Sequence, residues 1–208
     1  MAKVSDSVLG NISGKIGPVV VYTRKGESIV REHVIPKDPQ TPAQLAQRMK
    51  LTLANSGLKP LKNHINVGYK GTDITYRKLV GVVMREYIVG DYPNLCIDYS
   101  RVIVSKGKMK LPMYASAELE NKTNSVNISW DTQIPSNSKQ GKANDLVVIV
   151  CFNEKLLESC TASKTAKREE GFVSVALPKY WKTDDVHFWL YLTSNFAQNR
   201  SDSLYIKI

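Results

Sequence analysis

The segment "DVHFWLYLT" (residues 185–193) is rich in β-branched and aromatic residues, a composition typical of a β-strand. Successive side chains along a strand point to opposite faces. One face carries Val186, Phe188, Leu190 and Leu192, and the other carries His187, Trp189 and Tyr191. Both faces are apolar or aromatic, so we expect this strand to be covered on both sides.

The sequence around this strand predicts an all-β module over residues 111–208. Candidate strands recur there between turn signals, at a spacing typical of an immunoglobulin-like or fibronectin-like sandwich. They cover residues 113–119, 125–130, 145–152, 155–160, 172–177, 185–193 and 203–208. In "SVNISW" (125–130) apolar and polar residues alternate, which predicts a polar outer face for that strand. The Cys…Trp…Cys spacing of antibody domains is missing, so the sequence predicts the architecture alone.

In such a topology the third strand, here "DLVVIVCF" (145–152), pairs with the sixth, residues 185–193. The third-strand residues expected in the sandwich core are Leu146, Val148, Val150 and Phe152. The remaining residues form a candidate interface on the outside: Val147, Ile149, Cys151, His187, Trp189 and Tyr191. A soluble monomer rarely leaves such a patch bare, so we expect the N-terminal module or another chain to cover it. Two alternatives are a sugar that stacks on Trp189 and a further segment of the same sandwich.

Residues 1–110 predict an α+β module, which begins with a hairpin. The segments "VVVYT" (19–23) and "SIVREHV" (28–34) flank "RKGE", in which Gly26 can supply a positive φ. The stretch before it, "GNISGKIG" (10–17), lacks the spacing and the Ser/Thr of a phosphate-binding loop. We therefore expect a turn that leads into a strand, and not a nucleotide site.

Helices follow the hairpin. Thr41, Pro42 and Gln44 form a helix start with a capping box, and we expect this helix to pack on the hairpin as one unit. A second helix is predicted from Pro60 and a third over roughly residues 73–88. The segments "LCID" and "RVIVS" are expected to form short strands before a basic connector, which ends the first domain at residue 110.

The charge is concentrated in the first half of the chain. Residues 1–110 hold 18 Lys and Arg against 8 Asp and Glu, whereas residues 111–208 hold 11 against 11. A basic module can bind a polyanion such as nucleic acid through counterion release. The candidate contacts are Arg24, Lys25, Arg48, Arg77, Lys78 and Arg85. The alternative is a solvated basic surface that aids solubility.

The sequence offers no convincing catalytic or metal-binding group. Asp184 and Asp185 are adjacent and are expected to form a turn, and the three histidines fall in separate segments. The three cysteines lack C-x-x-C spacing, which predicts small buried side chains in a reducing compartment. We expect no enzyme activity, no cofactor and no metal. No apolar run is long enough to span a membrane and no signal peptide is evident, so we expect a cytoplasmic protein or one released within an assembly.

The first module resembles an uncharacterised family of Bacteroidetes proteins. The resemblance rests on "GKIGPVVVYTRKGESIVRE" (14–32), "DPQTPAQLAQRMKL" (38–51) and "IDYSRVIVSKG" (97–107). Members of this family resemble the chain in a Gly-Lys-x-Gly hairpin, a T-x-A-Q-x-x-Q-R helix and a C-terminal Ig-like sandwich. The resemblance implies a layout and no activity.

The two readings of function that remain belong to different classes. The preferred one is a non-enzymatic structural or interaction protein that acts through protein–protein contacts, for example in a phage or cell-surface assembly. The alternative is a polyanion-binding protein that uses the basic N-terminal half.

Overall fold

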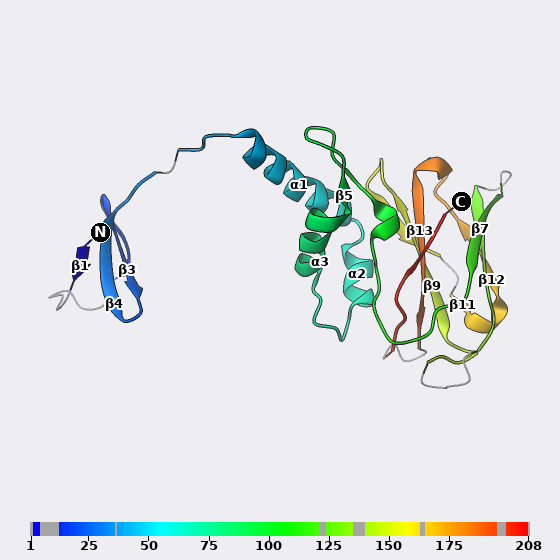
Figure 1. The fold of residues 1–208 in the computed structure, drawn as a ribbon. Coiled ribbons are helices and arrows are strands. Elements are labelled where there is room, and N and C mark those ends of the chain that lie inside the picture. Colours follow the sequence, from blue (N-terminus) through cyan, green and yellow to red (C-terminus); the bar gives the residue numbers. More distant parts are fainter. Residues whose placement is uncertain are drawn as a thin grey trace. The chain divides into compact units, whose positions relative to one another are not determined.

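The computed structural model describes residues 2–4, 13–35, 37–120, 124–134, 140–162, 165–194 and 199–207 (Figure 1), with the backbone alone for residues 2–4. The chain divides into two compact units, Met1–Thr41 and Pro42–Ile208. Helices and antiparallel sheets are both present, so the protein belongs to the mixed α+β class.

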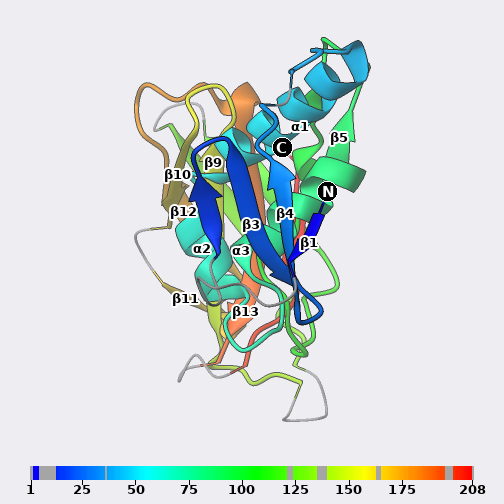
Figure 2. The same ribbon diagram turned by 90° about the vertical axis from the view of Figure 1, so that its left-hand side faces the viewer.

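The first unit is a single antiparallel sheet in the order β1-β4-β3-β2. Its strands are β1 (Ala2–Val4), β2 (Gly14–Ile16), β3 (Val19–Arg24) and β4 (Glu27–Glu32). Figure 2 shows β1, β4 and β3 side by side. Lys25 and Gly26 both have positive φ, 54° and 81°, as a type I′ hairpin turn requires. The predicted hairpin around "RKGE" is therefore confirmed. Within "GNISGKIG", residues 14–16 form the edge strand β2.

The second unit opens with a helical layer. Its helices are α1 (Pro42–Leu58), α2 (Lys62–Gly68) and α3 (Tyr76–Val82), and α3 continues as a π-helical turn, η1 (Val83–Tyr87). The three predicted helices are thus confirmed. The hairpin and α1 were expected to form one unit, but they belong to different compact units.

A short connector follows, with β5 (Ile88–Val89) paired to β6 (Cys96–Ile97) and a 3-10 turn, η2 (Tyr99–Arg101). The strand expected at "RVIVS" is absent from the described structure of residues 101–105. The Asp98 carboxylate accepts a hydrogen bond from the Ser100 backbone N–H at 3.1 Å, which starts the 3-10 turn instead.

Two antiparallel sheets make up the rest of the second unit. The smaller has the order β12-β8-β7, and the larger has the order β10-β9-β13-β14 with β11 also paired to β9. The smaller sheet contains β7 (Ala115–Glu120), β8 (Ser125–Trp130) and β12 (Phe172–Ala176). The larger contains β9 (Leu146–Asn153), β10 (Glu158–Thr161), β11 (Ala166–Lys167), β13 (Val186–Thr193) and β14 (Leu204–Ile206). Two further 3-10 turns are η3 (Arg168–Glu170) and η4 (Thr183–Asp185).

Two hydrophobic cores flank the larger sheet. One lies between the two sheets and includes Ile128 of β8, Ile149 of β9 and Leu190 of β13. The other joins the helices to the opposite face of the larger sheet, and Leu58 and Trp189 belong to it. In Figure 1, α2 and α3 lie on one side of β9 and β13 while β7 and β12 lie on the other. Residues 42–110 therefore share a core with the strands, whereas the sequence predicted a domain boundary at residue 110.

Candidate functional site

The outer face of β13 is covered by residues of the same chain. Trp189 and Tyr191 are buried in the core that includes Leu58, Ile65 and Val83 of the helical layer. The Trp189 indole N–H donates a hydrogen bond to the Val102 carbonyl at 2.8 Å. This cover is the one expected from the N-terminal half. It also rules out the sugar site proposed for Trp189, because that side chain has 0% exposure.

The predicted faces of β9 are reversed in the structure. Ile149 pairs with Leu190 and Cys151 pairs with Phe188, so Val147, Ile149 and Cys151 face the sandwich core and not the outside. Val150 pairs with Trp189 on the helical side. The assignment failed because both faces of β9 are apolar, so a shift of one residue leaves the hydrophobic pattern unchanged.

His187 of β13 lies in a hydrogen-bonded group at the edge of the same face. Its Nδ1 is 2.9 Å from the Tyr205 hydroxyl, and its Nε2 is 3.3 Å from the Glu154 carboxylate. The Tyr99 ring lies 4.8 Å from the imidazole, centroid to centroid. Burial raises the pKa of Tyr205, and the nearby carboxylates of Asp98 and Glu154 raise it further. The group links β13, β14 and the β9–β10 turn.

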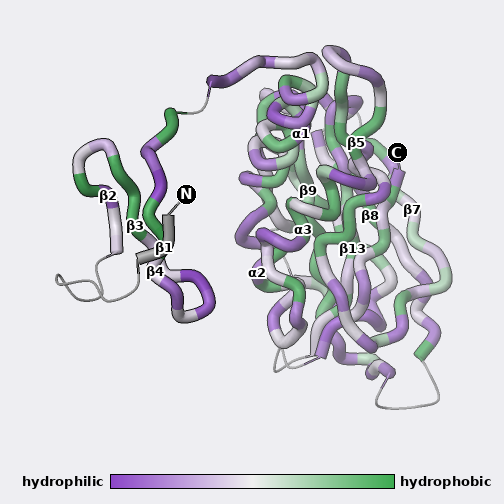
Figure 3. The backbone as a smooth tube through the Cα atoms, turned by 60° about the vertical axis from the view of Figure 1, so that its left-hand side comes forward, coloured by the Kyte–Doolittle hydropathy of each residue, from purple (hydrophilic) through white to green (hydrophobic). Residues whose placement is uncertain are grey.

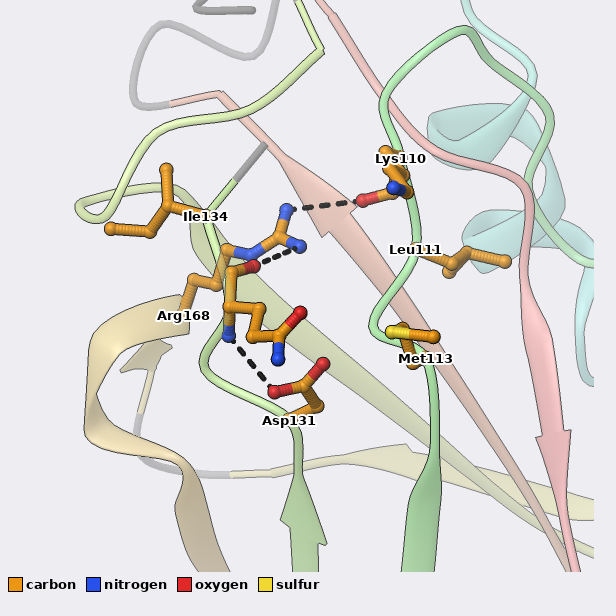
Figure 4. A pocket seen from close by; sticks show the side chains of 7 residues that line it. Lys110, Leu111, Met113, Asp131, Ile134 and Arg168 are labelled. Atoms are coloured by element: carbon orange, nitrogen blue, oxygen red, sulfur yellow. Dashed lines mark hydrogen bonds between the residues drawn. The ribbon is translucent and has the colours of Figure 1, made fainter. Parts of the chain in front are cut away.

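A small pocket lies beside Arg168, at the start of η3 (Figure 4). The guanidinium is buried and donates hydrogen bonds to the carbonyls of Lys110, at 3.0 Å, and Gln133, at 2.8 Å. Burial lowers the pKa of Arg168, while Asp145 and Asp131 oppose this shift. The pocket volume is about 40 Å³, which suits water molecules and is far below the few hundred Å³ typical of metabolite sites.

Arg168 is therefore best described as a clamp between loops. It joins the connector at Lys110 and the loop after β8 to the segment before β12. The Trp130 indole also donates to the Arg168 carbonyl, at 2.9 Å. This role of Arg168 could not be predicted from the sequence, since Arg168 stands in a polar, turn-like stretch with no signal of burial. Among the described residues, no group of three or more His, Cys, Asp or Glu is placed to hold a metal ion.

The predicted polyanion contacts are divided between the two units. Arg24 and Lys25 lie at the hairpin tip of the first unit, and the other four lie in the second. Arg77, Lys78 and Arg85 are exposed on α3 and η1. Lys78, Gly81 and Arg85 are spaced by three and four residues, so they lie on one face of the helix. The Arg85 guanidinium lies over Gly81, at 3.5 Å from the position that a Cβ would take there. Arg48 is exposed on α1.

This basic helical face belongs to a strongly charged segment. Residues 42–110 hold 12 Lys and Arg against 4 Asp and Glu, whereas residues 1–41 hold 6 against 4. Most of the positive excess of the chain therefore lies in the helical layer and its connector. No helix in the described part of the chain is both long and apolar enough to cross a bilayer.

One face of the first unit is a further candidate surface. Ile16 pairs with Val19 and Val21 pairs with Val30, so these four side chains share one side of the sheet, which we call the apolar face. Ile16 is 52% exposed. Of the side chains described in this unit, Ile29 alone is buried. In Figure 3 the hydrophobic colour of β3 contrasts with the hydrophilic hairpin tip.

The chain belongs to a family of unknown function, DUF6266, whose sequence profile matches residues 11–207. This match spans both compact units. No curated protein matches the chain.

Proposed function

We propose that this protein is a non-enzymatic interaction protein that assembles with copies of itself through the apolar face of its N-terminal sheet. The observation that carries the proposal is the row of Ile16, Val19, Val21 and Val30 on one side of a single-layered sheet. A sheet with an apolar face needs a second layer for stability. The first unit contains 41 residues and supplies no such layer from its described part.

A second copy of the chain suits this face because its centre is apolar: among strands β2, β3 and β4, the one charged residue on this side is Glu32, opposite Val19 at the end of β4. Lys15 and Arg31 are each adjacent to an apolar-face residue along their strands, so they point to the opposite side. Two copies related by a twofold axis would place the apolar face against itself, as two sheets pack in a sandwich.

We also infer that residues 111–208 form an immunoglobulin-like or fibronectin-like sandwich. In support of this, β9 and β13 pair, as do the third and sixth strands of that topology. We infer that the Gly-Lys-x-Gly hairpin and the T-x-A-Q-x-x-Q-R helix start are motifs of the Bacteroidetes family described above. Sandwich domains often serve assembly, so the inferred fold fits a structural protein that acts in the cytoplasm or is released within an assembly.

Light scattering coupled to size exclusion tests the self-assembly. The wild-type chain should elute as a discrete oligomer, and Ile16→Glu should shift it to the monomer by placing a charge on the apolar face. Lys15→Glu is the matched control, because it introduces the same side chain at the neighbouring position on the opposite face. A wild-type protein that remains monomeric at all accessible concentrations contradicts the proposal.

Polyanion binding is the second candidate function, and the exposed row of Arg77, Lys78 and Arg85 favours it. Neutralising these three residues with glutamine should lower heparin affinity and the dependence of binding on salt. The control replaces the exposed Lys142, Lys179 and Lys182, which lie among residues 111–208 and give the same change in net charge. Equal losses in both triple variants would indicate a general charge effect and no site on α3.

A further inference from the structure

Two cysteines face each other across β9 and β10. Cys151 of β9 and Cys160 of β10 are directly opposite residues of this antiparallel pair. Both are free thiols; Cys151 is fully buried in the sandwich core and Cys160 is half-buried against it. The two thiols are close enough for each to shift the pKa of the other. The sequence predicted unremarkable buried cysteines, and nothing in their spacing indicated that the two would meet.

The backbone places these residues within the range that a disulfide needs. The Ala162 N–H donates to the Ile149 carbonyl at 3.3 Å, so the pair two residues before it, Cys160 and Cys151, is also of the hydrogen-bonded type. The Cα atoms of such a pair are about 5.5 Å apart. Disulfides span Cα separations of about 4.4–6.8 Å. The Cβ atoms of a hydrogen-bonded pair are about 5.5 Å apart, whereas a disulfide needs about 3.5–4.5 Å. A bond between the sulfur atoms therefore requires rotation of the side chains and a small local approach of β10, an edge strand that can move, to β9.

The two thiols differ in reactivity. Interaction with the neighbouring Cys160 thiol, together with burial, raises the pKa of Cys151. Interaction with the Cys151 thiol lowers the pKa of Cys160. Since a thiolate is the nucleophilic form of cysteine, Cys160 is the residue that attacks.

Access to Cys160 comes from the edge of the larger sheet. The strand β10 is the outermost strand of the order β10-β9-β13-β14. Two residues before Cys160, the Glu158 carboxylate accepts hydrogen bonds from the Tyr180 hydroxyl at 2.8 Å and the Trp181 indole at 3.0 Å. Tyr180 is 66% exposed, so these side chains border the thiol without sealing the edge of the sheet.

We propose that Cys151 and Cys160 form a dithiol site that a hydroperoxide oxidises to a cross-strand disulfide. The Cys160 thiolate attacks a peroxide oxygen, the O–O bond breaks, and Cys160 becomes a sulfenic acid as one water is formed. The Cys151 sulfur then attacks the Cys160 sulfur, the S–O bond breaks, and the leaving hydroxide takes the Cys151 proton as a second water. Two thiols lose two electrons and two protons, and hydrogen peroxide is reduced to two waters.

The experiment uses the full chain with Cys96→Ser, which removes the third and exposed thiol. The folded protein is treated with hydrogen peroxide, quenched, denatured and alkylated with iodoacetamide, and its intact mass is measured. We expect two alkyl groups before oxidation. After oxidation we expect none, together with the loss of two hydrogens, and dithiothreitol should restore both sites. Retention of both alkylation sites, or oxidation that yields only covalent dimers, would overturn the proposal.

Two variants in the same background separate the roles of the thiols. With Cys151→Ser, Cys160 should stop at a sulfenic acid that dimedone traps. With Cys160→Ser, the buried Cys151 should survive the same exposure and be alkylated after denaturation. A Cys160 that proceeds to sulfinic acid while Cys151 remains reduced in the two-thiol protein would also overturn the proposal. If either variant misfolds, the two-thiol protein alone still decides the outcome.

Discussion

The N-terminal sheet and the central sheet of this protein both contain valine-rich strands but differ in how the apolar side chains are covered within their own units. Strand β3 contains three consecutive valines, and β9 contains a run of valine and isoleucine. In the second unit, the helices cover one face of β9 and β13 and the smaller sheet covers the other. In the first unit, Val19 and Val21 remain half-buried and Ile16 is exposed.

This difference shows that an apolar strand does not by itself indicate what will cover it. The central strands β9 and β13 are buried because other segments of the second unit, the helices and the smaller sheet, pack on their two faces. The first unit is too small to supply its own second layer. If the central sheet is the stability core and the N-terminal sheet an assembly surface, matched substitutions in the two sheets should have different effects.

The largest expected effect is on the central sheet. Trp189→Ala should lower the free energy of unfolding by about 3–5 kcal/mol, because it leaves a cavity between the helices and β13. It also leaves the Val102 carbonyl without its donor. Denaturant unfolding monitored by far-UV circular dichroism measures the loss.

The matched substitution in the N-terminal sheet is Val21→Ala. Its side chain is half-buried, so the expected loss is about 1 kcal/mol from the first unit alone. The unfolding transition of residues 42–208 should stay in place. A loss as large as that of Trp189→Ala would remove the contrast between the two sheets.

An effect between those of Trp189→Ala and Val21→Ala is expected at the Arg168 clamp. Arg168→Leu leaves the carbonyls of Lys110 and Gln133 unpaired, so unfolding should become easier by about 1–3 kcal/mol. Lys167→Leu is the control, since Lys167 is exposed and adjacent in sequence. If both variants unfold at the same denaturant concentration, the clamp has no role in stability.

One glycine in each unit has a positive φ and open space around it, so the same substitution by alanine can be compared in the two units. Gly26 has φ of 81° and Gly71 has φ of 87°, and neither has an atom within 4 Å of an added Cβ. Alanine at either position should therefore cost about 1 kcal/mol through backbone strain alone. Gly71→Ala should shift the main unfolding transition, whereas Gly26→Ala should weaken oligomer formation. A shift of the main transition by both would show that the units unfold together.

Much of this fold could be predicted from local signals. The hairpin turn at Lys25 and Gly26, the helix start at Pro42 and most strands follow from turn residues and alternation. The faces of β9 could not be predicted, since residues 146–152 are apolar on both sides. The burial of Trp189 and Tyr191 was predicted correctly, because a row of His187, Trp189 and Tyr191 presents more aromatic surface than a soluble protein usually exposes to solvent.

The candidate sites were less accessible to sequence reasoning because they depend on pairing. Ile16 and Val30 meet on one face only when the order β4-β3-β2 is known. Likewise Cys151 and Cys160 are nine positions apart, and only the register of β9 and β10 places them opposite one another. The sequence shows how polar each segment is, whereas these sites depend on which segments become neighbours.

The smallest expected effect concerns pH and the helical layer that covers the central sheet. Burial lowers the pKa of His64 in α2 below its ordinary value of 6.5. Well above pH 6.5 the imidazole is neutral in both the folded and the unfolded chain, so the free energy of unfolding does not depend on the titration of His64. As the pH falls below 6.5, the unfolded chain binds a proton that the folded chain does not, so the free energy of unfolding decreases. The decrease ends once the pH passes below the folded pKa.

Denaturant titrations of the wild type and His64→Gln at several pH values between neutral and mildly acidic measure this term. The variant should lose part of the acid dependence while its stability at neutral pH changes little, because glutamine is neutral throughout. Identical pH profiles for the two proteins would show that His64 is as well solvated when folded as when unfolded. In that case water reaches α2 within the layer that covers the outer face of β13, and this cover is less complete than the burial of Trp189 indicates.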